Sequence, residues 1–265
     1  MATLSIFAAT TFSKNFNWNL PNRISNFTLC EQPSSKGFSR EPYNVFSSLF
    51  FTSTYIFPLF FSIQDAFLDK NEYKTIISRY PKFSFVYGLV CLFHAAGTTF
   101  GHMCACNLGL ILDNTFLWSM LGWNIFISLY IHVNASRPYH RWYLLAFIIY
   151  TAGCSFIASY SEIILLQTVM TTILIVAIIT INIVGIYKNK KVVGRVGYFW
   201  TSFILTLFGI ICAALDPIIC HKNSFGTHSL WHIMGSFAIL FLYVYIWSVK
   251  DKESINLVSV SESQD

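Results

Sequence analysis

The sequence predicts an all-α membrane protein, built as a bundle of seven transmembrane helices. Of its 265 residues, 55% are hydrophobic and only 11% are charged, and the mean hydropathy is +0.56. A soluble domain normally contains about 25% charged residues. The apolar residues are grouped in stretches of about 20, the length at which a helix crosses a bilayer. This composition excludes a soluble binding module, and one domain accounts for the length of the chain.

Seven apolar stretches, joined by short polar connections, define the expected helices. Their predicted bounds are 43–64, 84–105, 108–131, 142–160, 162–187, 197–216 and 228–248. Together they form a seven-transmembrane domain over residues 43–248, between an N-terminal extramembrane segment (1–42) and a polar C-terminal tail (249–265). The first ten residues lack the basic region of a cleaved signal peptide. The helices show no internal repeat, which argues against a transporter built from repeated halves.

The basic residues predict how the helices are oriented. Of the 17 lysines and arginines, most lie in the first, third and fifth loops and in the tail. Cytoplasmic loops carry an excess of Lys and Arg, so we expect the N-terminus outside or lumenal and the C-terminus in the cytosol. The same bias explains the net charge of +5 without a nucleic-acid partner. The sequence specifies neither the particular membrane nor the oligomeric state.

Two histidines in the seventh stretch, His228 and His232, are the most informative residues. Residues at i and i+4 share one helix face, with Cβ atoms roughly 5–6 Å apart, and an ionisable side chain within a membrane helix marks a candidate functional site. The spacing suits two nitrogen ligands of one Zn²⁺, at about 2.0–2.1 Å each. The segment lacks the Glu of the HExxH motif, so a general base must come from another part of the chain.

His102 is the expected third ligand. The predicted orientation brings three ionisable residues to one membrane depth: His102 at the end of the second stretch, Asp113 in the third and His228 in the seventh. A hydrolytic zinc needs three protein ligands and one open position for water. We therefore predict a Zn²⁺ site at His102, His228 and His232. His94, two turns before His102, is expected behind this site or in the core.

Asp113, Thr98 and Asp216 are the expected polar partners of the zinc. Zinc lowers the pKa of its bound water to about 7, and Asp113 would accept the proton and return it to the leaving group. The Thr98 hydroxyl would donate to the developing oxyanion, an effect of about 2.7–4 kcal/mol. Asp216 would accept the second N–H of a ligand histidine. Alternatively, Asp113 caps its helix, Thr98 bonds to its own helix backbone, and Asp216 is structural.

The seven cysteines are expected to act mostly as small apolar side chains, because most fall in apolar stretches. An odd number of cysteines predicts no disulfide framework. Cys30 and Cys220 form one candidate bridge, since both are expected at the same membrane face.

Short motifs follow one another in a characteristic order over residues 28–248. They are Cys30-Glu31, Glu41-Pro-Tyr-Asn44 with Ser47-Ser48, Gly97-Thr98 to His102, Leu112-Asp113, Leu215-Asp216 with Cys220, and Gly226-Thr-His228 to His232. This ordered set resembles the alkaline ceramidase family, especially its bacterial-type members. The wider superfamily includes progestin and adipoQ receptors and hydrolases that remodel GPI-anchor lipids. The first two motifs favour the ceramidase branch.

The resemblance implies a function and a site. It implies that His102, His228 and His232 bind Zn²⁺, that Asp113 activates water, and that Thr98 takes the position of a catalytic serine. The reaction implied is hydrolysis of the ceramide amide to a sphingoid base and a fatty acid. Two other functions stay open: a zinc-dependent ester hydrolase acting on phospholipid or GPI acyl chains, and a non-catalytic lipid receptor with a structural zinc.

The resemblance also raises the question of Ca²⁺. Eukaryotic members of the family share an acidic N-terminal calcium site with an Asp-Trp-x-Glu-x-Asn stretch and a downstream Glu. Here Glu31 and Glu41 remain as possible calcium ligands, but Thr28 and Pro33 replace two oxygen donors. Since Ca²⁺ takes about six to eight oxygens, calcium dependence is doubtful. The alternative is that the two carboxylates pair with Arg40 or with loop amides.

Overall fold

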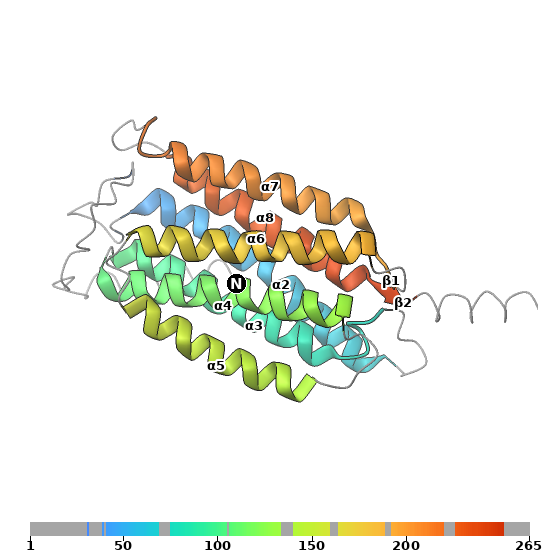
Figure 1. The fold of residues 1–265 in the computed structure, drawn as a ribbon. Coiled ribbons are helices and arrows are strands. Elements are labelled where there is room, and N and C mark those ends of the chain that lie inside the picture. Colours follow the sequence, from blue (N-terminus) through green and yellow to red (C-terminus); the bar gives the residue numbers. More distant parts are fainter. Residues whose placement is uncertain are drawn as a thin grey trace, which may run out of the picture.

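The computed structural model describes residues 31, 39, 41–68, 75–104, 106–133, 140–159, 164–188, 192–219 and 226–251. In this part of the chain, seven α-helices lie side by side in one bundle (Figure 1). All seven are long and apolar enough to cross a membrane, so the predicted seven-helix fold is confirmed and fits an integral multi-pass membrane protein. The helices are α2 (Pro42–Phe67), α3 (Pro81–Cys104), α4 (Asn107–Val133), α5 (His140–Ser159), α6 (Ile164–Lys188), α7 (Val196–Leu215) and α8 (Thr227–Ser248).

The helix bounds agree with the sequence prediction to within a few residues. The largest difference at a helix start is in α3, which begins at Pro81 rather than at residue 84. Proline suits the first turn of a helix, because its fixed φ is helical and the missing N–H would have no partner there. Hydropathy does not detect this turn, since it contains the polar residues Lys82 and Ser84. Most of the predicted extramembrane segments lie outside the described residues.

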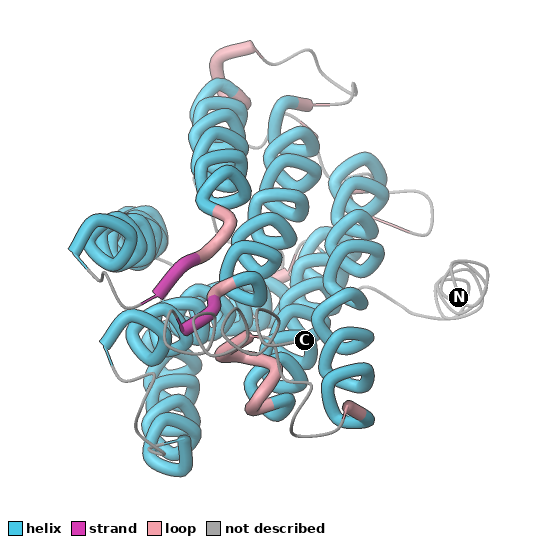
Figure 2. Tube along the Cα trace, turned by 90° about the vertical axis from the view of Figure 1, so that its right-hand side faces the viewer, coloured by secondary structure: helices cyan, strands magenta, loops and turns pink. Residues whose placement is uncertain are grey.

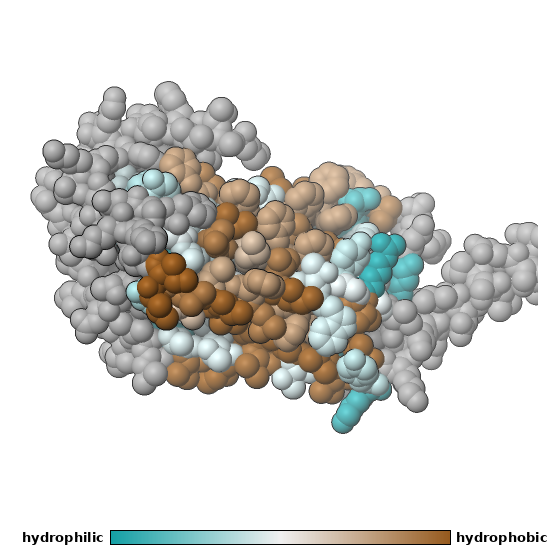
Figure 3. Space-filling model, turned by 90° about the horizontal axis from the view of Figure 1, so that it is seen from above, coloured by the Kyte–Doolittle hydropathy of each residue, from teal (hydrophilic) through white to brown (hydrophobic). Residues whose placement is uncertain are grey.

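Helix α4 is the centre of the bundle. It packs against α3, α5 and α6, while α2 packs against α3 and α8, and α7 packs against α8. In the most apolar segment of α4, 61% of the residues are buried inside the protein, against 17% in α5 and α7. The outer helices therefore turn apolar side chains outward, and Figure 3 shows the resulting brown apolar band. Such a band suits a lipid environment.

Interhelical hydrogen bonds pair several polar side chains inside the bundle. The Asn182 amide of α6 donates to Ser128 of α4 at 2.9 Å, and the Tyr243 hydroxyl of α8 donates to Ser84 of α3 at 2.9 Å. Small and polar residues at helix interfaces are typical of membrane bundles, where lipid offers no alternative partner.

A short β-ladder joins the start of α7 to the end of α8. Strand β1 (Val192–Val193) pairs antiparallel with β2 (Lys250–Asp251), with Val192 opposite Asp251, and both strands are magenta in Figure 2. The ladder lies at the end of the bundle opposite the turn between α3 and α4 (Figure 1).

Helices α3 and α4 approach each other closely through glycines. A Cβ atom added to Gly109 would lie 2.7 Å from the Cα of Gly101, and one added to Gly97 would lie 3.1 Å from the carbonyl oxygen of Leu112. Gly97 and Gly101 have the GxxxG spacing that lets helix backbones approach in membranes. This contact brings the face of α3 that carries Thr98 against Asp113 of α4.

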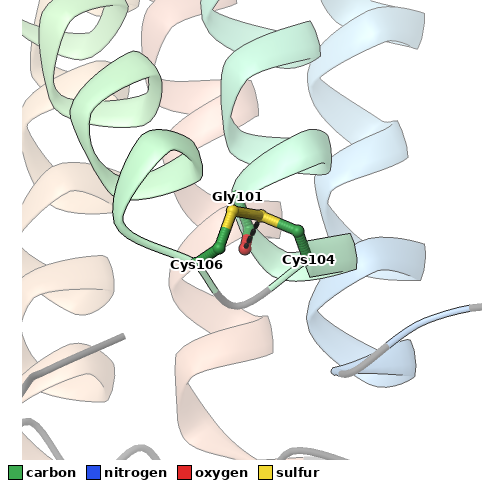
Figure 4. The surroundings of a disulfide bond; sticks show 3 residues. All are labelled: Gly101, Cys104 and Cys106. Atoms are coloured by element: carbon green, nitrogen blue, oxygen red, sulfur yellow. Dashed lines mark hydrogen bonds between the residues drawn. A yellow bond between two sulfur atoms is a disulfide. The ribbon is translucent and has the colours of Figure 1, made fainter. Parts of the chain in front are cut away.

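A disulfide closes the turn between these two helices. Cys104 at the end of α3 is bonded to Cys106, just before α4 begins, and their Cα atoms are 5.2 Å apart (Figure 4). The expectation that the cysteines form no disulfide framework is wrong at this turn, because the chain reversal brings two near neighbours within bonding distance. The candidate bridge between Cys30 and Cys220 lies outside the described residues.

Candidate metal centre

Three imidazoles meet at the end of the bundle where α3 turns into α4. They belong to His102, in the last turn of α3, and to His228 and His232, in the first two turns of α8. Ligand nitrogens of all three lie within 4.8 Å of one another, and no other group of three or more His, Cys, Asp or Glu residues in the described part of the chain could hold a metal ion. The ring centroids are 4.7–5.4 Å apart. The predicted trio is therefore brought together.

Glu41 holds the ring of His102. The His102 Nδ1 lies 2.5 Å from the Glu41 Oε2, and both side chains are buried. The Nδ1–H therefore donates to the carboxylate, and the lone pair lies on Nε2. That Nε2 is buried with no hydrogen-bond partner among the described residues. A buried nitrogen without a partner is unfavourable by about 1–3 kcal/mol, whereas a metal ion would use this lone pair.

His232 is oriented in the same way by α2. Its Nδ1 lies 2.9 Å from the Ser47 Oγ and 3.2 Å from the Asn44 carbonyl oxygen. The Ser47 hydroxyl donates its own hydrogen to that carbonyl, so the imidazole Nδ1–H is the donor to both oxygens. Nε2 is again the nitrogen with the free lone pair. A ligand histidine typically donates its other N–H to a carboxylate or a carbonyl, so both rings are arranged as metal ligands.

Asn44 links α2 to the ligand helices. Its backbone N–H and that of Tyr43 donate to the two carboxylate oxygens of Glu31, at 2.8 and 2.7 Å. The side-chain oxygen of Asn44 accepts the Ser229 hydroxyl at 2.8 Å, which joins α2 to α8. Negative charge near the N-terminus of a helix is favourable, so Glu31 stabilises the first turn of α2.

The calcium prediction for Glu31 and Glu41 stays a prediction. Both Glu31 oxygens accept backbone N–H groups, which belong to Tyr43 and Asn44 in the first turn of α2 and not to a loop. Burial raises the pKa of the Glu31 carboxyl, and the hydrogen bonds from Tyr43 and Asn44 oppose that shift. Glu41 contacts a candidate metal ligand, and Arg40 lies outside the described residues.

Thr98 and Asp113 form a pair next to the histidines. The Thr98 hydroxyl donates a short hydrogen bond to the Asp113 Oδ1. Thr98 is 2% exposed, whereas the Asp113 side chain is 25% exposed. Asp113 lies inside α4 rather than at its start, so it does not cap the helix. A Cβ atom added to Gly101, the neighbour of His102, would lie 3.6 Å from the Asp113 Cβ. A partly exposed carboxylate at this position can accept a proton from water.

Asp216 holds the backbone of a ligand residue. Its Oδ1 accepts the backbone N–H of His228 at 2.7 Å and the Thr227 hydroxyl at 3.1 Å. This buried carboxylate follows the end of α7 and stabilises the N-terminus of α8. The predicted contact between Asp216 and an imidazole N–H stays a prediction.

The supporting residues of α2 were not assigned from the sequence. The sequence marks Asn44 and Ser47 only as motif residues and Glu41 only as a possible calcium ligand, although together they orient His102 and His232. The sequence feature that could have identified them is a cluster of polar side chains at the start of an otherwise apolar helix. Polar residues in such a segment need partners, which in a bundle lie on neighbouring helices.

Searches against protein-family models and against curated proteins find no match to this chain.

Replacing Glu41 with Gln should weaken metal binding about 10–100-fold, the usual effect of losing a group that orients a ligand. Glutamine can still accept the Nδ1–H, but the negative charge that makes the imidazole a stronger ligand is lost. The metal affinity would be measured by competition with a coloured chelator. Glu31→Gln is the matched control, because Glu31 binds backbone amides instead of a ligand ring. Wild-type affinity in Glu41→Gln would contradict this role.

Proposed function

We propose that this protein is a zinc-dependent intramembrane amidase, which hydrolyses ceramide-like lipids to a sphingoid base and a fatty acid. The observation that carries the proposal is the buried, unpartnered Nε2 of His102, which lies beside two further imidazoles. Three histidine ligands with a fourth position for water are typical of catalytic zinc. Asp113 and Thr98 supply the acid–base and hydroxyl groups that a hydrolase needs beside the metal.

Each residue has a defined part in the proposed reaction. When bound, Zn²⁺ would lower the pKa of a coordinated water and polarise the substrate carbonyl. Asp113 takes a proton from the attacking water as the new C–O bond forms at the amide carbon. Thr98 donates to the oxygen that gains negative charge. Asp113 then returns the proton to the amide nitrogen, the C–N bond breaks, and the products are a free amine and a carboxylic acid.

Two features support the proposed lipid class: the apolar surroundings of the site and the family resemblance. The histidines lie at the end of a bundle whose outer faces are apolar, and α2 exposes Phe46 and Phe50 close to Asn44 and Ser47 in sequence. An acyl chain in the membrane can approach along such a surface. The ordered motifs, with Glu41-Pro-Tyr-Asn44 at the start of α2, favour a ceramide amide over other lipids.

The charges of the described loops support the proposed orientation. Several basic residues lie at or near the helix ends far from the histidines: Arg79, Lys82, Lys188, Arg195 and Lys250. Since Lys and Arg favour the cytosolic side, we propose that the histidine site faces the outer or lumenal side and that the C-terminus is cytosolic.

The test is fatty-acid release from a ceramide by the full-length protein in detergent. We expect release that stops when a zinc chelator is added and returns when Zn²⁺ is restored. A phospholipid and a GPI lipid, assayed in parallel, separate the amidase from an ester hydrolase. Zinc-loaded, folded protein that releases no fatty acid from any of these lipids would contradict the proposal and favour a receptor with a structural zinc.

A further inference from the structure

His94 lies deeper in the bundle than the Thr98–Asp113 pair and faces it. It precedes Thr98 by one turn of α3 and is 4% exposed. Its Nε2 is 4.0 Å from the Asp113 Oδ1, the same oxygen that accepts the Thr98 hydroxyl. This distance is longer than a hydrogen bond, which is about 2.7–3.2 Å for N–H···O, but an imidazole can cover the difference by a small rotation.

The other nitrogen of His94 faces α2. Its Nδ1 is 3.4 Å from the Tyr55 hydroxyl, and the Phe51 ring packs against the imidazole with centroids 4.8 Å apart. Phe51 also contacts the ring of His232, at 5.6 Å. Both aromatic residues are buried. His94 is therefore held in a tight apolar setting, with one polar group near each ring nitrogen.

The Tyr55 hydroxyl is placed where it can set the tautomer of His94. A neutral imidazole has one donor and one acceptor nitrogen. If the phenol O–H of Tyr55 donates to Nδ1, the hydrogen of the ring lies on Nε2 and points towards Asp113. The ring then offers a donor to the carboxylate that the proposed reaction uses.

The proposed reaction leaves Asp113 in need of such a donor. Thr98 has a single hydroxyl hydrogen, which now goes to the Asp113 Oδ1. When that hydrogen turns to the substrate oxygen, the Oδ1 loses its partner. In a low-dielectric site an unpartnered carboxylate oxygen is unfavourable and free to rotate away from the attacking water. A second donor beside the same oxygen would prevent this.

We infer that His94 is a positioning residue, whose Nε2–H replaces the Thr98 hydroxyl at the Asp113 Oδ1 while Thr98 serves the substrate. This inference rests on the proposed hydrolase function. It assigns Tyr55 the role of setting the tautomer, so that α2 contributes to the proton-transfer side of the site as well as to the metal side.

The experiment compares His94→Leu, His94→Gln and Tyr55→Phe in the full-length, zinc-loaded protein. We expect His94→Leu to lower kcat about 10–100-fold, as for other groups that orient a functional side chain, with KM and zinc content unchanged. His94→Gln should recover part of kcat, because its amide N–H reaches close to the position of Nε2. Tyr55→Phe should lower kcat less than His94→Leu. His132→Leu is the control, because it makes the same change at a histidine in the last turn of α4, at the end of the bundle far from the site.

The outcomes separate this inference from the proposed function. Active, chelator-sensitive wild-type protein together with wild-type kcat in His94→Leu would overturn the inference alone. Equal losses in His94→Leu and His94→Gln would also overturn it, because packing would then explain the effect. Inactive wild-type protein would overturn the function, and the inference with it. If His94→Leu does not fold, Tyr55→Phe decides: a lower kcat at full zinc content supports the inference, and a wild-type kcat overturns it.

Discussion

Replacing His228 with Ala should release the metal and abolish lipid hydrolysis. His228 supplies one of three imidazoles whose donor atoms lie within 4.8 Å of one another, and two ligands cannot complete a catalytic zinc site. The loss in metal affinity should exceed the roughly 10–100-fold loss caused by changing a group that only orients a ligand. Metal content per protein after dialysis and fatty-acid release from a ceramide are the two measurements.

Thermal unfolding in detergent gives an independent measure of the same loss. A ligand that binds only the folded state stabilises it by about 2.7 kcal/mol at a hundredfold excess over its Kd. Adding Zn²⁺ to metal-free wild-type protein should therefore raise its Tm, whereas Tm of His228→Ala should not respond to Zn²⁺.

His132→Ala is the matched control for this prediction. It removes a histidine at the other end of the bundle, where the imidazole lies near Asn182 and Tyr245. This variant should keep both its metal and its Tm response to Zn²⁺, even if it is less stable. Full metal content and activity in His228→Ala would rule out the proposed centre.

Replacing Asp113 with Asn should stop turnover while the metal stays bound. Asparagine has nearly the same shape, and its amide oxygen can still accept the Thr98 hydroxyl, so the contact between α3 and α4 should persist. It cannot accept a proton from water. General acid–base catalysis typically contributes about 10²- to 10⁴-fold, so kcat should fall by that factor. Metal analysis and steady-state kinetics on one preparation measure both quantities.

Asp65→Asn is the control for the loss of a buried carboxylate. Asp65 lies near the opposite end of α2 and accepts the indole N–H of Trp247 at 3.1 Å, a contact that asparagine can keep. Its kcat should match that of the wild type. If Asp113→Asn hydrolyses lipid at the wild-type rate, Asp113 is not the base. If wild-type protein and Asp113→Asn both bind zinc without turnover, a receptor with a structural metal becomes the better description.

The sequence alone determined the fold class and the three candidate metal ligands. Inside a membrane, the backbone N–H and C=O groups of an apolar run of about 20 residues can all be hydrogen-bonded within the run only if it is a helix. This property depends on local composition, so all seven helices could be predicted. The i, i+4 spacing of His228 and His232 is also local, because one helix turn brings the two rings to one face. His102 could be added because helix order and membrane depth follow from counting the spans.

Only the tertiary structure decided which groups support those ligands. Glu41 and His102 are 61 residues apart, and Ser47 and His232 are 185 apart, so no local pattern links them. The same holds for the disulfide in the α3–α4 turn and for His94, whose contacts with Tyr55 and Asp113 come from two other helices. Side-chain hydrogen bonds act over about 3 Å. Which side chains come within this distance depends on how α2, α3, α4 and α8 pack, and this packing arises from the close approach of whole helices.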